Sequence, residues 1–549
     1  MDRQEQIFPH LTDAQLGRIA GLGQRRSVKA GDLLFEAGDQ NTDFFVVVEG
    51  GIEIVRPVAG REEPVAALGP GQFTGELNML SARRARARGR VSADGSIVAL
   101  NRDGLRSLVQ RDSELSEILL RAFILRRVAL ISQVDNDLVL LGSRHSLSTL
   151  RLKEFLTRNG EPFTYHDVET EAGMQELLDG LRISVNEVPV LVCKAGNVLR
   201  NPTVESLSNA LGLTPRLDAK AVRDVVIVGG GPAGLGAAVY AASEGLDVLV
   251  LESTAPGGQA GTSSRIENYL GFPTGISGFA LAGRALTQAE KFGAEVAIAR
   301  TAVRFDCDQR PYRVHLSDGE VVQTRSIVIA TGARYRRLEV PELARFEGAG
   351  IFYSATHMEA QSCKGEEIAV VGGGNSAGQA AVFLSGIASR VDVVVRGPCL
   401  AQSMSRYLIQ RIENSPNLEL RTRTRIESLE GNGRLEQVRW RHLETGATET
   451  RPVRNLFVMT GAEPNTGWLK GCVVLDDKSF VKTGSDLQPE ELAEAKWPLP
   501  RRPYLMETSI PGVFAVGDVR SSSVKRVASA VGEGSICVQL IHHALQEGL

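Results

Sequence analysis

The sequence predicts a multidomain protein in which a β-rich N-terminal region and a small α/β layer precede a large α/β unit. Three observations support this fold class. Short apolar runs broken by glycines fill residues 1–135, strand-like and helix-like segments alternate within residues 136–215, and strong apolar strands alternate with helices from residue 222 onward. The length of 549 residues also favours roughly three to four domains.

The overall composition excludes several classes of protein. The chain is 43% hydrophobic and 23% charged, with a net charge of −3, so nothing biases it toward nucleic acid or an anionic membrane. The first residues contain no apolar signal-peptide core, and no uncharged apolar run reaches the ~18 residues of a membrane span. We therefore expect a cytoplasmic protein with no nucleic-acid partner and no membrane partner.

The cysteines are scattered, and none belongs to a C-x-x-C pair. The six are Cys193, Cys307, Cys363, Cys399, Cys472 and Cys537. In a chain expected to be cytoplasmic, this pattern argues against a disulfide framework and against a zinc site. We expect no bound metal.

The region 1–135 has the texture of a small β-roll with flanking helices. Apolar runs at 44–48 and 52–55 predict two short strands, and glycines fall where tight turns would separate such strands. A helical stretch at 113–132 closes the region.

The region 136–215 predicts a small α/β layer, because strands and helices alternate within fewer than 80 residues. The expected order is a strand at 138–141, a helix at 147–157, a strand at 163–166, a helix at 173–181, a strand from Val188, and a helix at 204–211.

The third region opens with a glycine-rich turn between an apolar strand, 225–228, and a helix that ends near Ala242. The turn consists of Gly229, Gly230, Gly231, Pro232, Ala233 and Gly234. The first glycine of G-x-G-x-x-G permits the tight turn, the second admits a pyrophosphate, and the third allows close packing of helix and strand. The helix N-terminus attracts phosphate, and Glu252, at the end of the next strand, is placed to bind ribose hydroxyls. The pattern predicts a Rossmann-like dinucleotide-binding domain.

A second turn of the same kind follows a strand at 368–371. It consists of Gly372, Gly373, Gly374, Asn375, Ser376 and Ala377, and a helix at 378–385 follows. The next strand, 391–395, is followed by Arg396 instead of an acidic residue, and arginine suits the 2′-phosphate of NADP. We expect NADPH rather than NADH, bound by Gly372, Gly374, Asn375, Ser376, Arg396 and Arg406. The alternative is that Arg396 is an ordinary solvated charge.

From residue 222 to the end, the chain resembles the thioredoxin reductase family. The motifs that carry the resemblance are 256–259 (PGGQ), Asn268, 330–333 (ATGA), 460–466 (TGAEPNT), 516–518 (VGD) and 525–528 (KRVA). The resemblance implies an FAD domain in two parts, 222–340 and 467–549, interrupted by an NADPH domain, 341–466. It implies FAD contacts from Gly258, Gln259, Asn268, Thr331, Gly332, Gly517, Asp518, Lys525, Arg526 and Val527, beside the first glycine turn. It also implies a homodimer and rotation of the NADPH domain during turnover.

The family's dithiol is missing. Thioredoxin reductases carry C-A-T-C between the two domains, where this chain has Ser354, Ala355, Thr356 and His357. A serine hydroxyl cannot form a disulfide, because that chemistry requires a thiolate. Two candidate catalytic residues remain: Cys363, as a lone thiol or a packing residue, and His357, as a proton donor near the flavin or a spacer.

The middle region, 136–215, resembles glutaredoxin-like domains in the thioredoxin-like fold class, and it too lacks the dithiol. The turn 143–146 (SRHS) stands where those domains carry C-x-x-C, and Val188-Pro189 resembles their cis-proline loop. The resemblance implies a structural or docking domain, with a peptide-binding or thiol-binding role as the alternative.

The N-terminal region resembles the cyclic nucleotide-binding β-roll of catabolite-activator-type sensors. Gly75 and Glu76 match the family's Gly-Glu pair, in which the carboxylate binds ribose and a downstream arginine pairs with the phosphate. Direct alignment puts that arginine at Ala85, inside an arginine-rich stretch, so Arg84 is the candidate. A cyclic nucleotide, another anion, and no ligand at all remain as alternatives.

Three functions follow from these observations. The first is a flavin oxidoreductase that passes hydride from NADPH to FAD and on to a small-molecule or protein acceptor. The second is a disulfide reductase that uses Cys363 or the thiols of a partner. The third is a sensor or scaffold that binds FAD and NADPH without turnover.

Overall fold

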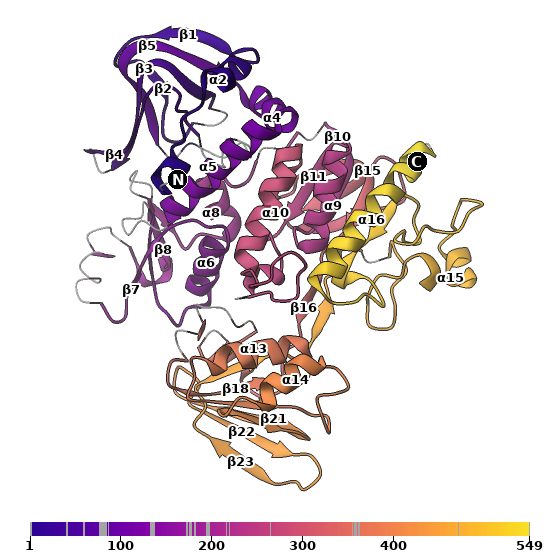
Figure 1. The fold of residues 1–549 in the computed structure, drawn as a ribbon. Helices are drawn as coiled ribbons and strands as arrows, with labels where there is room; N and C mark the ends of the chain where they lie inside the picture. The colour runs from indigo at the N-terminus through magenta and orange to yellow at the C-terminus, as the bar shows by residue number, and fades with distance from the viewer. Residues whose placement is uncertain are drawn as a thin grey trace.

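The computed structural model (Figure 1) describes residues 3–547 except 40–41, 59–60, 76–78, 80–84, 86, 132–137, 172–173, 175–177, 180–182, 194–197, 216, 219, 264, 348, 354, 356–358, 361–362 and 470. It contains an N-terminal β domain, a small α/β domain, a large α/β unit, and a second α/β unit inserted into the large one.

The N-terminal domain is built on a five-stranded sheet of order β1-β5-β3-β4, with β2 paired to β5. Its elements are α1 Arg3–Ile7, α2 Asp13–Ala20, β1 Gln24–Val28, β2 Leu33–Phe35, β3 Phe44–Val58, β4 Arg61–Leu68, β5 Arg88–Leu100, α4 Arg102–Arg111 and α5 Ser113–Ile131. The prediction of two strands at 44–48 and 52–55 is wrong, because β3 runs unbroken through both. The glycine pair between them produces a bulge instead of a turn: Gly50 has φ +84 and the register with β5 shifts there.

The small α/β domain contains a four-stranded sheet of order β7-β6-β8-β9, in which only β6 and β7 are parallel. Its elements are β6 Leu138–Gly142, α6 Leu147–Arg158, β7 Thr164–Asp167, η1 Val185–Glu187, β8 Val190–Cys193, β9 Val198–Arg200 and α8 Val204–Leu211. The expected helix 173–181 falls mostly outside the described residues. The last expected strand begins at Val190, after the cis Val188–Pro189 peptide bond, and β9 was not anticipated.

The large unit has a seven-stranded sheet of order β12-β11-β10-β15-β14-β13, with β26 paired to β15. Its elements are β10 Val222–Val228, α9 Pro232–Ser243, β11 Val248–Glu252, η2 Ala260–Thr262, α10 Gly278–Phe292, β12 Glu295–Ile298, β13 Ala302–Asp306, β14 Tyr312–Leu316, β15 Val321–Ile329, η3 Gly467–Leu469, η4 Gly484–Asp486, α15 Pro489–Glu494, β26 Val513–Ala515, η5 Gly517–Val519 and α16 Val527–Gln546. Helices α9, α10 and α16 lie side by side over one face of this sheet (Figure 1).

The inserted unit has a parallel five-stranded sheet of order β17-β24-β18-β19-β20 and an antiparallel sheet β21-β22-β23. Its elements are α11 Leu343–Phe346, β17 Ile351–Phe352, β18 Glu367–Val371, α13 Asn375–Ser385, β19 Arg390–Val394, α14 Arg406–Glu413, β20 Leu418–Arg421, β21 Thr424–Glu430, β22 Gln437–His442, β23 Thr448–Arg451 and β24 Asn455–Val458. The antiparallel pair β16 Ala333–Tyr335 and β25 Ala462–Pro464 joins this unit to the large one.

One pair of cysteines corrects the expectation of an unbridged chain. Cys307 and Cys472 form a disulfide with a Cα–Cα distance of 6.0 Å, although 165 positions separate them in the sequence. Their spacing gives no sign of this, because the whole inserted unit lies between them. Both pack against the same hydrophobic core, beside Phe305 and Leu469.

The described residues contain neither a membrane-spanning helix nor a metal-binding cluster. None of their helices is long and apolar enough to cross a membrane. No group of three or more His, Cys, Asp or Glu side chains among them is arranged to hold a metal ion.

Candidate cofactor-binding sites

The first glycine turn lies between β10 and α9, as the sequence predicts, and two of its glycines leave no room for a side chain. Gly229 has φ +109, and a Cβ atom there would collide with the carbonyl oxygen of Ala330. A Cβ on Gly234 would collide with the carbonyl oxygen of Gly229. Gly231 caps α9 without a side-chain hydrogen bond, and Pro232 follows at the first helical position. The first turn of α9 therefore keeps the open N-terminus that a phosphate requires.

Glu252 ends β11, and its carboxylate is buried, with 7% of the residue exposed. One oxygen accepts the N–H of Gly230 at 2.7 Å, and the other accepts those of Thr254 and Ala255 at 2.9 and 3.1 Å. Glu252 thus organises the turn itself, a role that the motif alone did not reveal. A carboxylate offers about four lone-pair sites, so the remaining capacity fits a ribose hydroxyl.

The segment 256–259 closes over the glycine turn. Gly257 donates its N–H to the carbonyl of Gly230 at 2.7 Å. A Cβ on Gly258 would lie 3.1 Å from the Cα of Gly231, so the two backbones touch. The side chain of Gln259 donates to the carbonyl of Ala333. The structure therefore brings this motif, the glycine turn and the start of β16 together.

The late motif 516–518 reaches the same place from the C-terminal part of the chain. A Cβ on Gly517 would lie 2.8 Å from the Cβ of Ala233, and the Gly517 N–H donates to Glu533 at 2.7 Å. Burial raises the pKa of the half-buried Asp518 carboxyl, and the nearby Lys525 ammonium partly opposes that shift. A half-buried carboxyl group beside a glycine turn is suited to accepting hydrogen bonds from the hydroxyl groups of a ligand.

The remaining predicted FAD residues lie in three separate places. Thr331 and Gly332 lie at the junction of the two units, where Thr331 exchanges hydrogen bonds of 2.9 Å with Asn465 in both directions. Lys525, Arg526 and Val527 lead into α16. Asn268 is exposed, and among the described residues it makes no hydrogen bond to the glycine turn.

The chemistry of this site fits FAD. A glycine-rich turn, an open helix N-terminus and a carboxylate with acceptor capacity left for a ribose hydroxyl together suit an adenine dinucleotide. Gly517 lies against the same turn from a distant part of the chain, and the half-buried Asp518 follows it.

The second glycine turn has the same construction in the inserted unit. Gly372 has φ +145, and a Cβ there would collide with the carbonyl oxygen of Met459. Helix α13 starts at Asn375, three residues earlier than expected, and Gly374 caps it without a side-chain hydrogen bond. The turn is therefore also open to a phosphate.

The side chain of Asn375 has a structural role at the predicted NADPH site. Its side-chain oxygen accepts the N–H of Ser405 at 2.7 Å, and the Ser403 hydroxyl donates to the carbonyl of Gly373 at 2.9 Å. The Asn375 side-chain oxygen therefore holds the start of α14 over the turn, and the dinucleotide contact expected of Asn375 stays a prediction for its N–H groups. Ser376 is exposed beside it.

Two predicted arginines flank this turn. Arg396 follows the end of β19 and Arg406 is the first residue of α14, and both are exposed. Within the described part of the chain, neither forms an ion pair. Their positive charge is thus available to a phosphate, which fits the 2′-phosphate of NADP.

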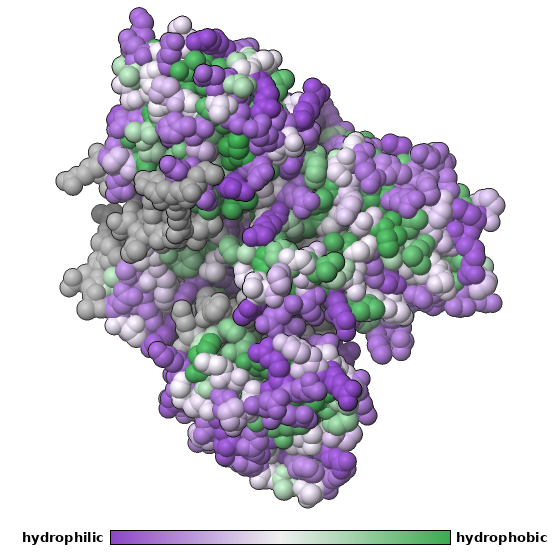
Figure 2. Space-filling view, viewed as in Figure 1, coloured by the Kyte–Doolittle hydropathy of each residue, from purple (hydrophilic) through white to green (hydrophobic). Residues whose placement is uncertain are grey.

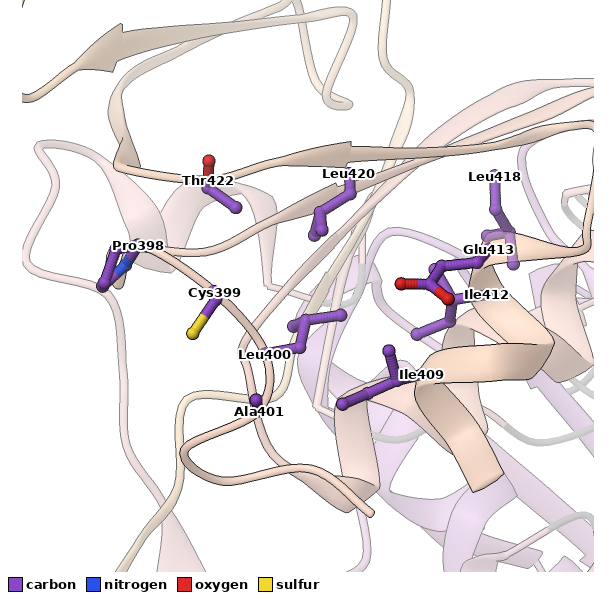
Figure 3. A pocket seen from close by; sticks show the side chains of 10 residues that line it. All are labelled: Pro398, Cys399, Leu400, Ala401, Ile409, Ile412, Glu413, Leu418, Leu420 and Thr422. Carbon is purple, nitrogen blue, oxygen red and sulfur yellow. The ribbon is translucent and has the colours of Figure 1, made fainter. Parts of the chain in front are cut away.

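A separate cavity of about 270 Å³ lies behind the loop that precedes α14, between α14 and β20 (Figure 3). Its walls are largely apolar, and the exposed Cys399 stands at one side. No residue of either glycine turn lines it, so it is not a dinucleotide site.

The candidate redox residues give little support to thiol chemistry. Cys363 is 0% exposed, and its thiol donates to the carbonyl of Glu359 at 3.4 Å. Ser354 and His357 lie outside the described residues. In the small domain, Ser143 is hydrogen-bonded to Glu169, and Ser146 caps α6 by accepting the N–H of Thr149. The two serines at the C-x-x-C positions therefore serve the turn and the helix cap.

In the N-terminal domain, Gly75 occupies a left-handed conformation with φ +107. Its carbonyl accepts a hydrogen bond of 2.8 Å from Arg126, whose guanidinium also lies 4.8 Å from the ring centroids of Phe8 and Phe73. Glu76 and Arg84 lie outside the described residues. Helix α5 therefore contacts the chain immediately before the predicted ligand-binding glutamate.

One dinucleotide-binding unit inserted into another defines a class of oxidoreductases that work with two dinucleotides. Residues 223–534 match the family model for pyridine nucleotide-disulphide oxidoreductases, and residues 25–112 match that of the cyclic nucleotide-binding domain. The chain belongs to the pyridine nucleotide-disulphide oxidoreductase family. Within it, the protein is a thioredoxin reductase-like enzyme that carries an N-terminal cyclic nucleotide-binding domain.

Individual relatives agree with this assignment. The chain is 31% identical to the thioredoxin reductase of Bacillus subtilis, over 59% of this chain and 96% of that protein. It is 33% identical to NADPH-dependent thioredoxin reductase 3 of Arabidopsis thaliana, over 62% of this chain and 63% of that protein. Among solved structures, the thioredoxin reductase of Lactococcus lactis in its FR conformation superimposes with a TM-score of 0.53 at 28% identity, covering 59% of this chain and 99% of that one.

Proposed function

We propose that this protein transfers electrons from NADPH to FAD and then to an acceptor that does not depend on a dithiol of its own. The observation that carries this proposal is that two intact glycine turns occur in a chain that lacks both dithiols: Ser354 and His357 stand at one C-x-x-C motif, and Ser143 and Ser146 at the other. With both cofactors bound, hydride passes from the nicotinamide C4 to the flavin N5.

The residues of the chain bind and orient the two cofactors. The turn 229–234, braced by Glu252, holds the FAD pyrophosphate, and Asp518 accepts hydroxyl hydrogen bonds from the ribityl chain. The turn 372–377 holds the NADPH pyrophosphate, while Arg396 and Arg406 pair with its 2′-phosphate. The β16–β25 pair is the connection about which the inserted unit rotates to bring the nicotinamide to the flavin.

A disulfide reductase that uses Cys363 is the second candidate. Its support is the family's name, and the burial of the Cys363 thiol opposes it, because thiol exchange requires an accessible thiolate. A scaffold that binds both cofactors without turnover is the third candidate.

Anaerobic titration with NADPH separates these functions. Bleaching of the visible flavin band supports electron transfer and excludes the scaffold. A panel of quinones, small disulfides and thioredoxin then identifies the acceptor. Thioredoxin turnover that C363S abolishes would establish the second candidate in place of the first. C537S, which alters another buried cysteine, is the matched control.

The N-terminal domain provides a ligand site in this proposal, with a cyclic nucleotide as its ligand and another anion as the alternative. Calorimetry with cyclic nucleotides on the full chain tests it, using Glu76→Ala and Arg84→Ala as the variants expected to lose binding. The small domain is proposed to be thioredoxin-like, and its β7-β6-β8-β9 sheet with helices α6 and α8 supports that fold.

A homodimer is part of the proposal, and one surface supports it. A groove of about 550 Å³ runs between α9, α10 and the start of α16, and its lining includes Tyr240, Tyr269 and Phe272. Tyr240 is 43% exposed and Phe279, at the groove edge, is 45% exposed. This face is directed toward the viewer in Figure 2. Exposed apolar surface of this kind marks association, and light scattering of wild type and Tyr240→Glu measures it.

A further inference from the structure

The small α/β domain touches the flavin site through the end of helix α6. Arg158, the last residue of α6, donates from Nη2 to the carbonyl of Gly258 at 2.8 Å. Asn159 donates from its side chain to the carbonyl of Thr254 at 3.0 Å. The Arg158 side chain is only 17% exposed. Both contacts fall on the loop that joins β11 to η2.

That loop is also held at the flavin side. Thr254 and Ala255 donate to the Glu252 carboxylate, and Gly257 donates to Gly230. The backbone of Gly258 lies against Gly231 in the glycine turn. The small domain therefore contacts one side of this loop at Thr254 and Gly258. The other side of the same residues packs against the glycine turn and Glu252.

The Arg158 contact fixes the orientation of one peptide group. In a trans peptide the C=O and the N–H point in opposite directions, so a Gly258 carbonyl directed at Arg158 turns the N–H of Gln259 away from the small domain. Gly258 has φ +52 and Gln259 has φ −66 and ψ −34. A left-handed residue followed by a right-handed one aims successive N–H groups to one side and forms an anion-binding concavity. Within the described residues, the N–H groups of Gly258 and Gln259 have no protein acceptor.

We propose that Arg158 is a positioning residue of the flavin site: by holding the Gly258 carbonyl, it presents the N–H groups of Gly258 and Gln259 to FAD. The proposal rests on the proposed function, in which FAD occupies this cradle. Arg158 lies outside residues 223–534, the segment that carries the family match. In this proposal the small domain, which lacks a dithiol, helps to shape the flavin-binding loop.

The guanidinium is suited to this task. Its Nη1 lies 3.3 Å from Glu154 one helical turn earlier, which orients the planar group along α6. A hydrogen bond from a charged donor contributes more than a neutral one. Arg158→Met keeps the aliphatic stem and removes every donor, so it isolates the hydrogen bond from the packing.

The experiment compares R158M with R151M in the full chain, because Arg151 is an exposed arginine of the same helix. FAD affinity is measured by fluorescence titration of the deflavinated protein. We expect R158M to bind FAD about tenfold more weakly than wild type, R158K to recover part of the loss, and R151M to match wild type.

Thermal unfolding separates positioning from a general structural role. Positioning predicts that R158M leaves the melting temperature of the deflavinated protein unchanged and reduces the increase that FAD produces. A lower melting temperature without FAD, combined with a normal increase on adding FAD, would overturn the proposal. So would equal FAD affinities of R158M and R151M. If R158M does not fold, R158K provides the test. The proposal is overturned if R158K binds FAD as tightly as wild type while its deflavinated form melts at a lower temperature. Failure of wild type itself to bind FAD would instead refute the proposed function.

Discussion

The guanidinium of Arg411 lies 3.1 Å from the carboxylate of Glu267, and this ion pair connects the inserted unit to the large unit. Arg411 belongs to α14, whereas Glu267 lies in the segment that leads to α10. Arg265 is a second partner of Glu267, at 3.6 Å, from the same unit as the carboxylate. The pair therefore stabilises the arrangement of the two units seen here, and the proposed rotation of the inserted unit would have to break it.

Removal of this ion pair is expected to speed the step that rotation controls. Both side chains are about two-fifths exposed, at 42% and 40%, so the pair contributes about 0.2–1 kcal/mol. R411M should raise the rate of flavin reduction by NADPH up to about fivefold at low salt, and the gain should shrink as salt screens the charges in wild type. Stopped-flow absorbance measures it. R345M, which breaks the Arg345–Glu342 pair inside one unit, is the control. An equal gain in R345M would refute the idea that the Arg411–Glu267 pair restrains the rotation.

The choice between NADPH and NADH should depend on Arg396 and Arg406. Both are exposed and lack an ion pair within the described residues, so a 2′-phosphate would be their partner. R396M and R406M should each raise the KM for NADPH about tenfold or more and leave the KM for NADH unchanged. Steady-state kinetics with both nucleotides provide the measurement. R423M is the control, because Arg423 lies in the same unit and is paired with Glu444. A parallel rise in both KM values would show a general defect.

The Cys307–Cys472 disulfide predicts the number of free thiols in the protein and a loss of stability when the bond is removed. Of the six cysteines, four should react with a thiol reagent in denaturant, and all six after reduction. Loss of the bond in C472S should lower the free energy of unfolding by about 2–4 kcal/mol, since the link constrains the unfolded chain. Denaturant unfolding measures it, with C399S as the control because Cys399 is exposed and unbridged. Six reactive thiols in the unreduced protein would contradict the disulfide.

The sequence predicted most of what local pattern can determine. Both glycine turns, their flanking strands and Glu252 lie where the spacing placed them, because a G-x-G-x-x-G turn is defined by a few consecutive residues. The long strand β3 was missed for the same reason: a glycine pair is typical of a turn, and only the pairing with β5 shows a bulge.

Contacts between distant segments were beyond sequence reasoning. The side chain of Asn375 accepts a hydrogen bond from Ser405, thirty positions away, a contact that the motif did not predict. The disulfide joins residues on either side of the inserted unit, and Arg158 meets Gly258 across 100 positions. No local period or spacing encodes such pairs, because the packing of the folded chain, within a domain or between two, brings them together.

The stability of the protein without FAD should depend on pH through Asp518. Burial raises the pKa of the Asp518 carboxyl above its usual 3.8, so the folded state binds this proton more tightly than the unfolded state does. The free energy of unfolding therefore falls as pH rises from about 4 through the raised pKa. Above that pKa, the loss of stability due to the buried Asp518 carboxylate stays constant. D518N removes the ionisable group and should make the deflavinated protein more stable than wild type near neutral pH. That advantage should disappear as pH falls below about 4.

The same substitution should weaken FAD binding, because a carboxylate accepts hydroxyl hydrogen bonds and the amide of asparagine replaces one acceptor oxygen with a donor. Denaturant unfolding of the deflavinated protein across this pH range, together with FAD titration near neutral pH, provides both readouts. D486N, which changes another acidic residue of the same C-terminal part, is the control and should leave both readouts unchanged, because among the described residues Asp486 forms only a long ion pair, 3.9 Å, with Arg520. A D518N protein that is less stable than wild type at neutral pH without FAD would show that the carboxylate stabilises the fold, contrary to the cost expected from its burial.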